Sequence, residues 1–464
     1  MRKFIFFTLL VLGVSACTQS GDSISGKPYD ILKPEVYNEL QKQYSSIADY
    51  ESGTAIVLKG ELYGLINSRG KEVLPCQYDT IYPLENNMRI IGENNMFGMV
   101  SATGRVCISC TYEETQPTVS ANYFPFKRNG KWGFLTKTEE TAIQFKYDDV
   151  SRLTDTTFVA KIDGKSGLLT YTNKCILDIK YDRIAYKVLN KPEDPSYVYL
   201  NDKVAILNSR NEFVTDFEYS GGLESYVFPQ EGKYVEVSKI VSSRYRYNRY
   251  RYGLIEYETG KIVIPCEYEE LGDIAEGLLY ARKDNKYGYI DINNNVVIPF
   301  KYEDAANFSE GLARVAVHGG YYNSRYAGVL SYSKYGFIDK TGQFVIPPTF
   351  PNPMLNEYDA RGFHEGLAAM GERPDDNVLA HYFGYINTKG KYVIAPVYDR
   401  AHRFMHGVAL VRKNDKYGCI DKEGNVIIDL IYDDYKYRAE KDTVITLKKD
   451  NREFLFHFDG TPLQ

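Results

Sequence analysis

Residues 286–302 read KYGYIDINNNVVIPFKY, and this stretch decides the fold. The aromatic-glycine step that ends at Gly288 opens a short run that turns at Asp291, whose side chain is suited to an Asx-turn. The β-branched run 296–298 follows and stops at Pro299. Tyr302 then closes the stretch, directly before an acid. This order predicts short strands joined by tight turns.

The same pattern recurs from residue 51 to the end of the chain. Clear copies are KYGFIDKTGQFVIP at 334–347, YFGYINTKGKYVIAPVY at 382–398 and KYGCIDKEGNVIIDLIY at 416–432. The glycines that mark the copies are Gly64, Gly98, Gly133, Gly167, Gly253, Gly288, Gly336, Gly384 and Gly418. Two degenerate copies have Ala205 and Leu455 at this position. A period of this length predicts a repeat array, here of about eleven copies.

Each copy is expected to form about three short strands as a β-meander, without a helix. It resembles the WG repeat (or KWG repeat) of bacterial proteins, named for the step that occurs here as Lys131-Trp132-Gly133. The resemblance covers residues 51–464, although Tyr or Phe replaces the Trp elsewhere. It implies an all-β array and supplies no catalytic residues.

The number of copies bears on how the array is organised. Eleven three-stranded copies exceed the about 4–8 blades of one closed propeller. We therefore expect either two propeller-like arrays or one open superhelical array, with a seam near residues 190–220, where the copy at Ala205 is weak.

The N-terminus has the parts of a lipoprotein signal. Arg2-Lys3 precedes an apolar run, and Val14-Ser15-Ala16-Cys17 resembles the bacterial lipobox, in which the cysteine carries lipid. We expect a signal peptide at 1–16, a lipidated N-terminus and flexible tether at 17–33, and a short capping helix at 34–50. The alternative is an ordinary secretory signal with a chance cysteine at the cleavage site. The first interpretation predicts a lipid-anchored protein of the cell envelope, at the outer membrane or cell surface.

Composition supports the fold class and excludes one function. The chain has 464 residues, with 42 Tyr against 23 Phe and 1 Trp, and tyrosine suits a half-buried pleated surface. The net charge of −5 argues against a nucleic-acid-binding protein held by bulk charge.

No cysteine or histidine pattern predicts a metal or cofactor. The spacing of Cys107 and Cys110 fits a redox or zinc pair, but both occupy repeat positions that hold apolar residues in other copies. The same is true of Cys76, Cys175, Cys266 and Cys419. His402 and His406 are four residues apart, a spacing that brings two metal ligands together only on a helix. Their segment is predicted to be a loop.

The acid after the tyrosine recurs in most copies, for example at Asp79, Asp148, Glu303 and Asp433. A catalytic group belongs to one convergent site rather than to every repeat, so we interpret these acids as turn caps. The chain also lacks a phosphate-binding glycine loop and the serine-elbow and zinc-protease motifs. We therefore expect no enzyme.

Three copies are longer than the rest at one place, the hairpin before the aromatic-glycine step. Insertions at one position of a repeat lie along one edge of the array, often its binding side. The first insertion reads SSRYRYNRYRYG at 242–253, in which strand alternation places Arg on one face and Tyr on the other, with Asn248 near the turn. The candidate binding residues are Arg244, Tyr245, Arg246, Tyr247, Arg249, Tyr250, Arg251, Tyr321, Tyr322, Arg325 and Tyr326.

Two interpretations of these hairpins remain open. The guanidinium groups are suited to carboxylates, phosphates or acidic sugars, and exposed tyrosines to sugars or a protein partner. Alternatively, the Tyr face packs on a neighbour and the Arg face is simply solvated.

The sequence thus favours a non-enzymatic envelope lipoprotein that binds a protein or an envelope polymer such as a glycan. The alternatives are a carbohydrate-active enzyme, with two carboxylates about 5–10 Å apart in a deep pocket, and a passive structural spacer.

Overall fold

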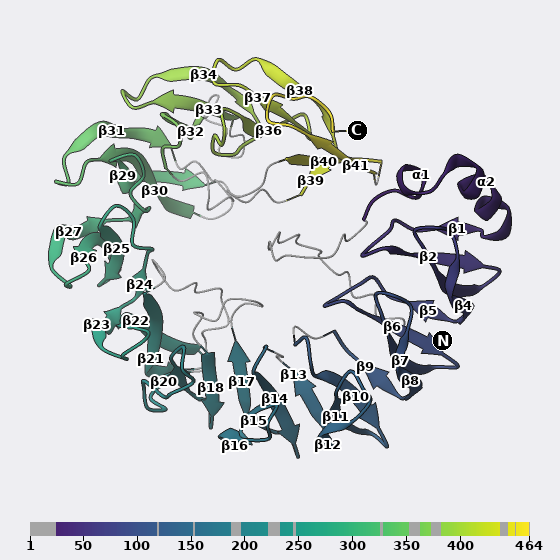
Figure 1. Cartoon of the computed structure of the whole chain (residues 1–464). Helices are drawn as coiled ribbons and strands as arrows, with labels where there is room; N and C mark the ends of the chain where they lie inside the picture. The colour runs from purple at the N-terminus through teal and green to yellow at the C-terminus, as the bar shows by residue number, and fades with distance from the viewer. Residues whose placement is uncertain are drawn as a thin grey trace. The chain divides into compact units, whose positions relative to one another are not determined.

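The chain folds into small antiparallel β-sheets that follow one another in sequence order (Figure 1). The computed structural model describes residues 25–117, 120–151, 154–186, 196–220, 233–244, 247–324, 328–351, 362–372, 382–436, 444–450 and 452–463. Within these residues, regular structure other than the two helices α1 and α2 is β-strand, which confirms the all-β repeat array. The signal peptide and Cys17 lie outside the described residues.

The N-terminal helices cover the first sheet and differ from the prediction. Helix α1 spans Pro28–Ile31 and α2 spans Pro34–Gln43. The helix predicted for 34–50 is shorter because the chain becomes extended at Tyr44 and then forms β1 (Ser46–Ile47). Leu32 is buried in one cluster with Leu40 and Tyr44. The tether predicted for 17–33 is therefore wrong for residues 28–33, which pack against the sheet.

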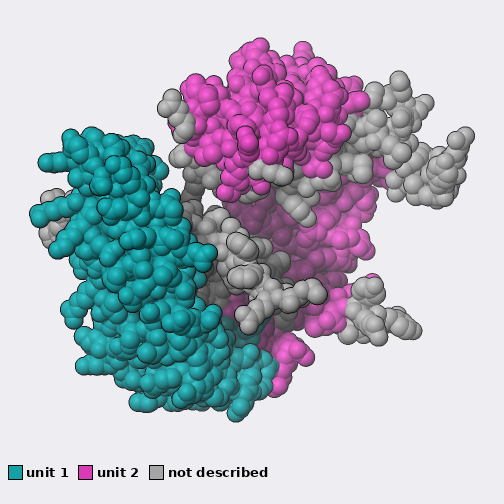
Figure 2. All heavy atoms as spheres, turned by 90° about the vertical axis from the view of Figure 1, so that its right-hand side faces the viewer, with its two compact units in different colours: residues 1–184 teal, residues 185–464 magenta. Residues whose placement is uncertain are grey.

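The chain divides into two compact units, one up to Ile184 and one from Ala185 on (Figure 2). The division falls within strand β17 (Arg183–Tyr186), a few residues before the seam predicted near 190–220. Strand β17 is grouped with the second unit, because it pairs with the strands of that unit.

The first unit contains four sheets of four strands. In sequence order their strands are β1 with β2 (Thr54–Lys59), β3 (Leu62–Asn67) and β4 (Glu72–Tyr78); β5 (Thr80–Ile81), β6 (Met88–Glu93), β7 (Met96–Ser101) and β8 (Val106–Tyr112); β9 (Glu114–Thr115), β10 (Phe124–Arg128), β11 (Lys131–Leu135) and β12 (Thr141–Tyr147); and β13 (Asp149–Ser151), β14 (Thr157–Ile162), β15 (Lys165–Thr170) and β16 (Cys175–Tyr181).

The second unit continues the series. Its strands are β17 (Arg183–Tyr186), β18 (Ser196–Leu200), β19 (Lys203–Leu207) and β20 (Tyr219–Ser220); β21 (Tyr234–Arg244), β22 (Tyr247–Glu256) and β23 (Ile262–Tyr268); β24 (Glu270–Leu271), β25 (Leu278–Lys283), β26 (Lys286–Asp291) and β27 (Val296–Tyr302); β28 (Asp304–Ala305), β29 (Ala313–Ser324), β30 (Gly328–Ile338) and β31 (Phe344–Pro351); β32 (Leu367–Glu372), β33 (Tyr382–Asn387) and β34 (Tyr392–Tyr398); β35 (Arg400–Ala401), β36 (Ala409–Lys413), β37 (Lys416–Ile420) and β38 (Val426–Tyr432); and β39 (Asp434–Tyr435), β40 (Ile445–Lys449) and β41 (Arg452–Phe456).

Most sheets have one strand more than the three predicted. The extra strand follows the tyrosine-acid pair and is usually two residues long, as in β28, which pairs with β29 through Asp304 and Ala305. The tyrosine-acid pair therefore ends one sheet, and the next residues begin the following one. We call the three longer strands of each sheet its first, second and third strands.

The marker glycine is required by a bulge in the third strand. Tyr287 pairs with Tyr302, whereas Tyr289 pairs with Ile298, so residues 299–301 bulge opposite Gly288. A Cβ atom on Gly288 would lie 2.6 Å from the Ile298 carbonyl oxygen. At the nine marker glycines this distance ranges from 2.3 to 2.8 Å, which is too close for any side chain.

The two degenerate copies lack this constraint. Ala205 holds the marker position, since it pairs with Val198, and its third strand β20 is only two residues long. The prediction of Leu455 is wrong by one residue. Phe454 pairs with Leu447 as Gly418 pairs with Val411, so Phe454 holds the position. Phe454 is tolerated because its sheet has no third strand in the described residues.

The two motif aromatics of a copy are partners across the second and third strands. Tyr287 lies opposite Tyr302, and Trp132 lies opposite Tyr147. Tyr302 and Tyr147 are fully buried. Much of the tyrosine excess is explained by these pairs, because cross-strand aromatic contacts stabilise a sheet.

Candidate functional site

At six positions in the described residues, the acid after the tyrosine caps the first hairpin turn of the next repeat. Asp148 accepts a hydrogen bond from the backbone N–H of Asp163 at 2.7 Å and binds Lys131 Nζ at 2.5 Å. The Lys131 ammonium and this N–H hold the pKa of Asp148 below its usual value. The same backbone contact is made by Asp79, Glu113, Glu269, Asp399 and Asp433. These acids are turn caps, as predicted, and each joins two repeats.

A second series of contacts joins loops at the other end of the first strands, and the sequence analysis missed it. The backbone N–H of Gly311 donates to Glu276 at 3.1 Å, that of Gly366 to Glu310 at 2.8 Å, and that of Gly407 to Glu365 at 2.9 Å. The signal was present in the recurrent Glu-Gly pair of these loops.

His402 and His406 lie in a loop between β35 and β36, as predicted for their segment. His406 follows the same backbone path as Glu310 and Glu365, with φ near +55°, and its ring lies 4.6 Å from that of Phe458. His402 is buried, and its ring lies 5.0 Å from that of Tyr435. Both rings are used in packing.

The two closest cysteines pack into different clusters. Cys107 lies against a cluster that contains Tyr112, and Cys110 against one that contains Tyr78. Burial raises the pKa of Cys110 to about 11, as it does that of Cys266 in the equivalent position. Within the described ranges, no group of three His, Cys, Asp or Glu residues is placed to hold a metal ion.

The two longest described hairpins, β21–β22 and β29–β30, belong to the second unit. Strands β21 and β22 pair from Tyr234 with Glu256 to Arg244 with Tyr247, and β29 and β30 pair from Ala313 with Ile338 to Ser324 with Gly328. In the first hairpin the last described pair joins Arg244 and Tyr247, and Asn248 pairs with Ser243 directly beside it.

The described part of the chain contains only some of the predicted binding residues. Tyr245, Arg246, Arg325 and Tyr326 lie outside the described residues, as does most of the third insertion at 373–381. For Arg244, Tyr247 and Tyr322, the backbone pairing is described and the side chains are not. Arg249, Tyr250, Arg251 and Tyr321 are described in full.

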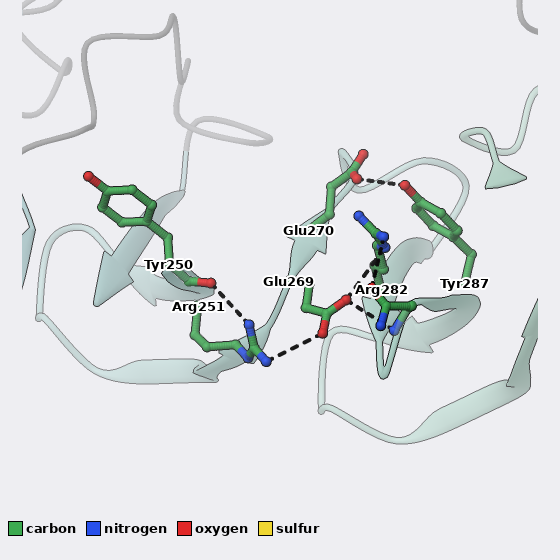
Figure 3. Close-up of polar contacts among 7 residues, drawn as sticks. Tyr250, Arg251, Glu269, Glu270, Arg282 and Tyr287 are labelled. Atoms are coloured by element: carbon green, nitrogen blue, oxygen red, sulfur yellow. Dashed lines mark hydrogen bonds and ion pairs between the residues drawn. The ribbon is translucent and has the colours of Figure 1, made fainter. Parts of the chain in front are cut away.

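The Arg face of the first hairpin forms part of a polar pocket of about 230 Å³. Arg251 Nη2 lies 3.3 Å from Glu269 Oε1, and Arg282 Nε lies 3.4 Å from Glu269 Oε2 (Figure 3). The remaining lining residues are Arg249, Tyr250 and Asn285. The hairpin thus contributes two guanidinium groups, and the following repeat contributes Glu269, Arg282 and Asn285.

A glycosidase mechanism uses two carboxyl groups that flank the bond to be cleaved. The lining of this pocket contains a single carboxylate, that of Glu269. The adjacent Glu270 accepts a hydrogen bond from the Tyr287 hydroxyl at 2.7 Å and lies outside the lining.

The tyrosines of the two hairpins differ in exposure. The ring of Tyr250 points away from Arg251, so the alternation of Arg and Tyr is present in this part of β22 (Figure 3). Its ring lies 6.4 Å from that of Tyr252, and both rings are half-buried. In the second hairpin, Tyr321 is 70% exposed and its ring lies 4.8 Å from that of His318. Among the tyrosine side chains of the two hairpins that the structure describes, Tyr321 is therefore the most exposed.

The sequence profile of the WG containing repeat matches the chain in eight segments. They are residues 63–95, 97–132, 132–165, 252–287, 287–322, 335–370, 383–417 and 417–441, which together make up more than half of the chain. No curated protein shows significant sequence similarity to it. None of the helices in the described residues has the length and hydropathy that a membrane span requires.

Solved structures show only a distant likeness. The β-propeller domain of the Trilobed protease from Pyrococcus furiosus is 11% identical, with a TM-score of 0.31, over 67% of this chain and 97% of that one. A eukaryotic initiation factor is 11% identical, with a TM-score of 0.32, over 71% and 92%. The extracellular domain of a putative hybrid two component system from B. thetaiotaomicron is 11% identical, with a TM-score of 0.20, over 87% and 74%.

Proposed function

This chain belongs to the family of proteins built from the WG containing repeat, and on that premise we propose that it is a non-enzymatic cell-envelope lipoprotein whose array binds a protein partner or an envelope polymer. The observation that carries the proposal is the charged pocket beside the outer part of the β21–β22 hairpin. Long hairpins on one edge of a repeat array are typical of a binding face.

The binding site is tested by removing the guanidinium groups of the first hairpin. Arg244, Arg246, Arg249 and Arg251 are changed together to Ser, and the mature protein is used to capture components from an envelope extract. We expect the variant to lose a component that the unaltered protein retains. If every interaction persists, the hairpin is not the binding site.

The envelope location is tested separately at Cys17. Cys17→Ser removes the proposed site of lipidation, so the protein should move from the membrane fraction to the soluble fraction. Because a lipidated cysteine is the only anchor in this proposal, retention of the variant in the membrane fraction contradicts it.

A further inference from the structure

The pocket beside the β21–β22 hairpin has more positive charge than its own carboxylate balances. Arg249, Arg251 and Arg282 line it, against the single acid Glu269. Arg251 and Arg282 both turn toward Glu269, and Arg249 is exposed, with no carboxylate partner in the described part of the chain. Two positive charges therefore remain in excess, which favours an anion in the pocket.

The guanidinium groups of Arg251 and Arg282 are held in place by contacts within the protein. Arg251 Nη1 donates to the Tyr250 carbonyl oxygen at 3.3 Å, and Arg282 Nη2 donates to Asn285 Oδ1 at 3.1 Å. Glu269 is itself fixed, because it accepts the backbone N–H of Asn285 at 3.1 Å. An incoming anion would therefore meet donors that are already ordered, which lowers the entropy cost of binding.

The second unit contains a matched position without the charge excess. Arg412 occupies the place of Arg282 three sheets further along and likewise lies over a tyrosine ring, that of Tyr417. Asp415 replaces Asn285 there and forms an ion pair with Arg412. Asp399 supplies the turn cap that Glu269 supplies in the pocket. The guanidinium group of Arg412 is therefore neutralised by its own carboxylate partner, so this twin position serves as a matched control for the pocket.

We propose that the pocket binds one oxyanion, a carboxylate or a phosphate group, presented by an acidic ligand. This inference rests on the proposed function, in which the hairpin edge is the binding face. The oxyanion accepts hydrogen bonds from Arg249 and from the free N–H groups of Arg251 and Arg282. These are the N–H groups that do not already contact Glu269, Tyr250 or Asn285. Glu269 is a positioning residue that fixes two of the guanidinium groups and opposes the ligand by its charge.

The test titrates the purified full chain with small oxyanions at low salt, by calorimetry. The probes are galacturonic acid for a carboxylate, inorganic phosphate for a phosphate, and galactose as the neutral control. We expect at least one oxyanion to bind, galactose not to bind, and the affinity to fall as salt is added. Failure of both oxyanions to bind overturns the proposal, and binding of only one identifies the group that the pocket prefers.

Variants separate binding from folding. Arg249→Gln and Arg282→Gln should each weaken oxyanion binding by about tenfold, because each removes a charged donor. The matched control Arg412→Gln should leave the affinity unchanged. An equal loss in all three variants would mean that net charge alone, rather than the pocket, determines binding, and would overturn the proposal.

Glu269→Gln gives the sharpest result, since its sign depends on the mechanism. Gln keeps an oxygen that accepts the Asn285 N–H but removes the competing charge, so we expect oxyanion binding to strengthen several-fold. If Glu269 serves only to hold the pocket together, the same change weakens binding, and that result overturns the role assigned to its charge.

The outcomes also distinguish this inference from the proposed function. If capture of an envelope component depends on the hairpin arginines but no oxyanion binds, only the inference fails. If oxyanions bind in the pocket and capture is unaffected by the arginine changes, the inference stands and the proposed function fails.

Discussion

Gly288→Ala tests whether the third-strand bulge is what demands glycine at the repeat marker. Gly288 does not have the positive φ that favours glycine, so backbone conformation alone does not require it there. The structure instead assigns the requirement to space, because β27 crosses directly above its Cα atom. The variant should therefore be destabilised by a steric clash with backbone.

The size of the effect follows from the distances. The new methyl carbon would lie 2.6 Å from the Ile298 carbonyl oxygen and 2.9 Å from the Phe300 nitrogen. An ordinary contact between carbon and a carbonyl oxygen is about 3.3 Å, so β27 must retreat by about 0.7 Å. Overpacking of this kind costs about 1–3 kcal/mol, which corresponds to about a 5- to 150-fold increase in local opening.

Hydrogen exchange read by mass spectrometry is the suitable assay, because repeat arrays open locally rather than as one cooperative unit. Peptides from β26 and β27 should lose protection by this factor, and those from distant repeats should not. The reciprocal control is Ala205→Gly, at a marker position without a long third strand. It should cost the backbone entropy of glycine, about 0.5–1 kcal/mol, and the burial of the Ala205 methyl group, about 0.8 kcal/mol, with no clash against a third strand.

A small loss of protection in β27 would refute the clash at Gly288. If Gly288→Ala changes the protection of β27 by less than about twofold, the clash is relieved cheaply and the bulge does not explain the glycine.

Three further changes test the joints and the thiols. Asp433→Asn should lower the urea concentration at which the protein unfolds at neutral pH. The folded-state pKa of Asp433 lies below the ordinary 3.8, so the stability that its carboxylate contributes is complete above pH 3.8. That stability disappears as the pH falls through the lowered pKa, where the variant and the wild type should become equally stable. Cys110, with a pKa of about 11, should be alkylated far more slowly at pH 8 than the exposed Cys175, and equal rates in peptide mapping would contradict the burial. Glu310→Ala should speed amide exchange at Gly366, because it removes the acceptor of the Gly366 N–H. Unchanged exchange would mean that this contact does not protect the amide.

The sequence predicted the strands and turns well because their signals are local. The Asp291 turn formed as expected, with its side chain accepting the N–H groups of Asn293 and Asn295. The bulge opposite Gly288 could not be predicted, because spacing within one strand does not report its register against another. The misplaced marker at Leu455 has the same cause, since its register is fixed by the pairing of Lys449 with Arg452 rather than by the local pattern.

The candidate site was predicted in part. The alternation of Arg249 and Arg251 with Tyr250 gave the charged face of the hairpin. Glu269 and Arg282 were missed because they belong to the next repeat and come close only through the capped turn at Asn285. A pattern read one repeat at a time cannot show a pocket that two repeats share.

The turn caps also determine how such an array can change its length. Each acid belongs to one period of the sequence, and the turn that it caps belongs to the next, as with Asp148 and Asp163. A duplication or deletion of a whole period, wherever it is cut, therefore rejoins an acid of the usual kind to a turn of the usual kind. Copies can be gained or lost without a new interface having to evolve, whereas a cut of any other length separates an acid from its turn.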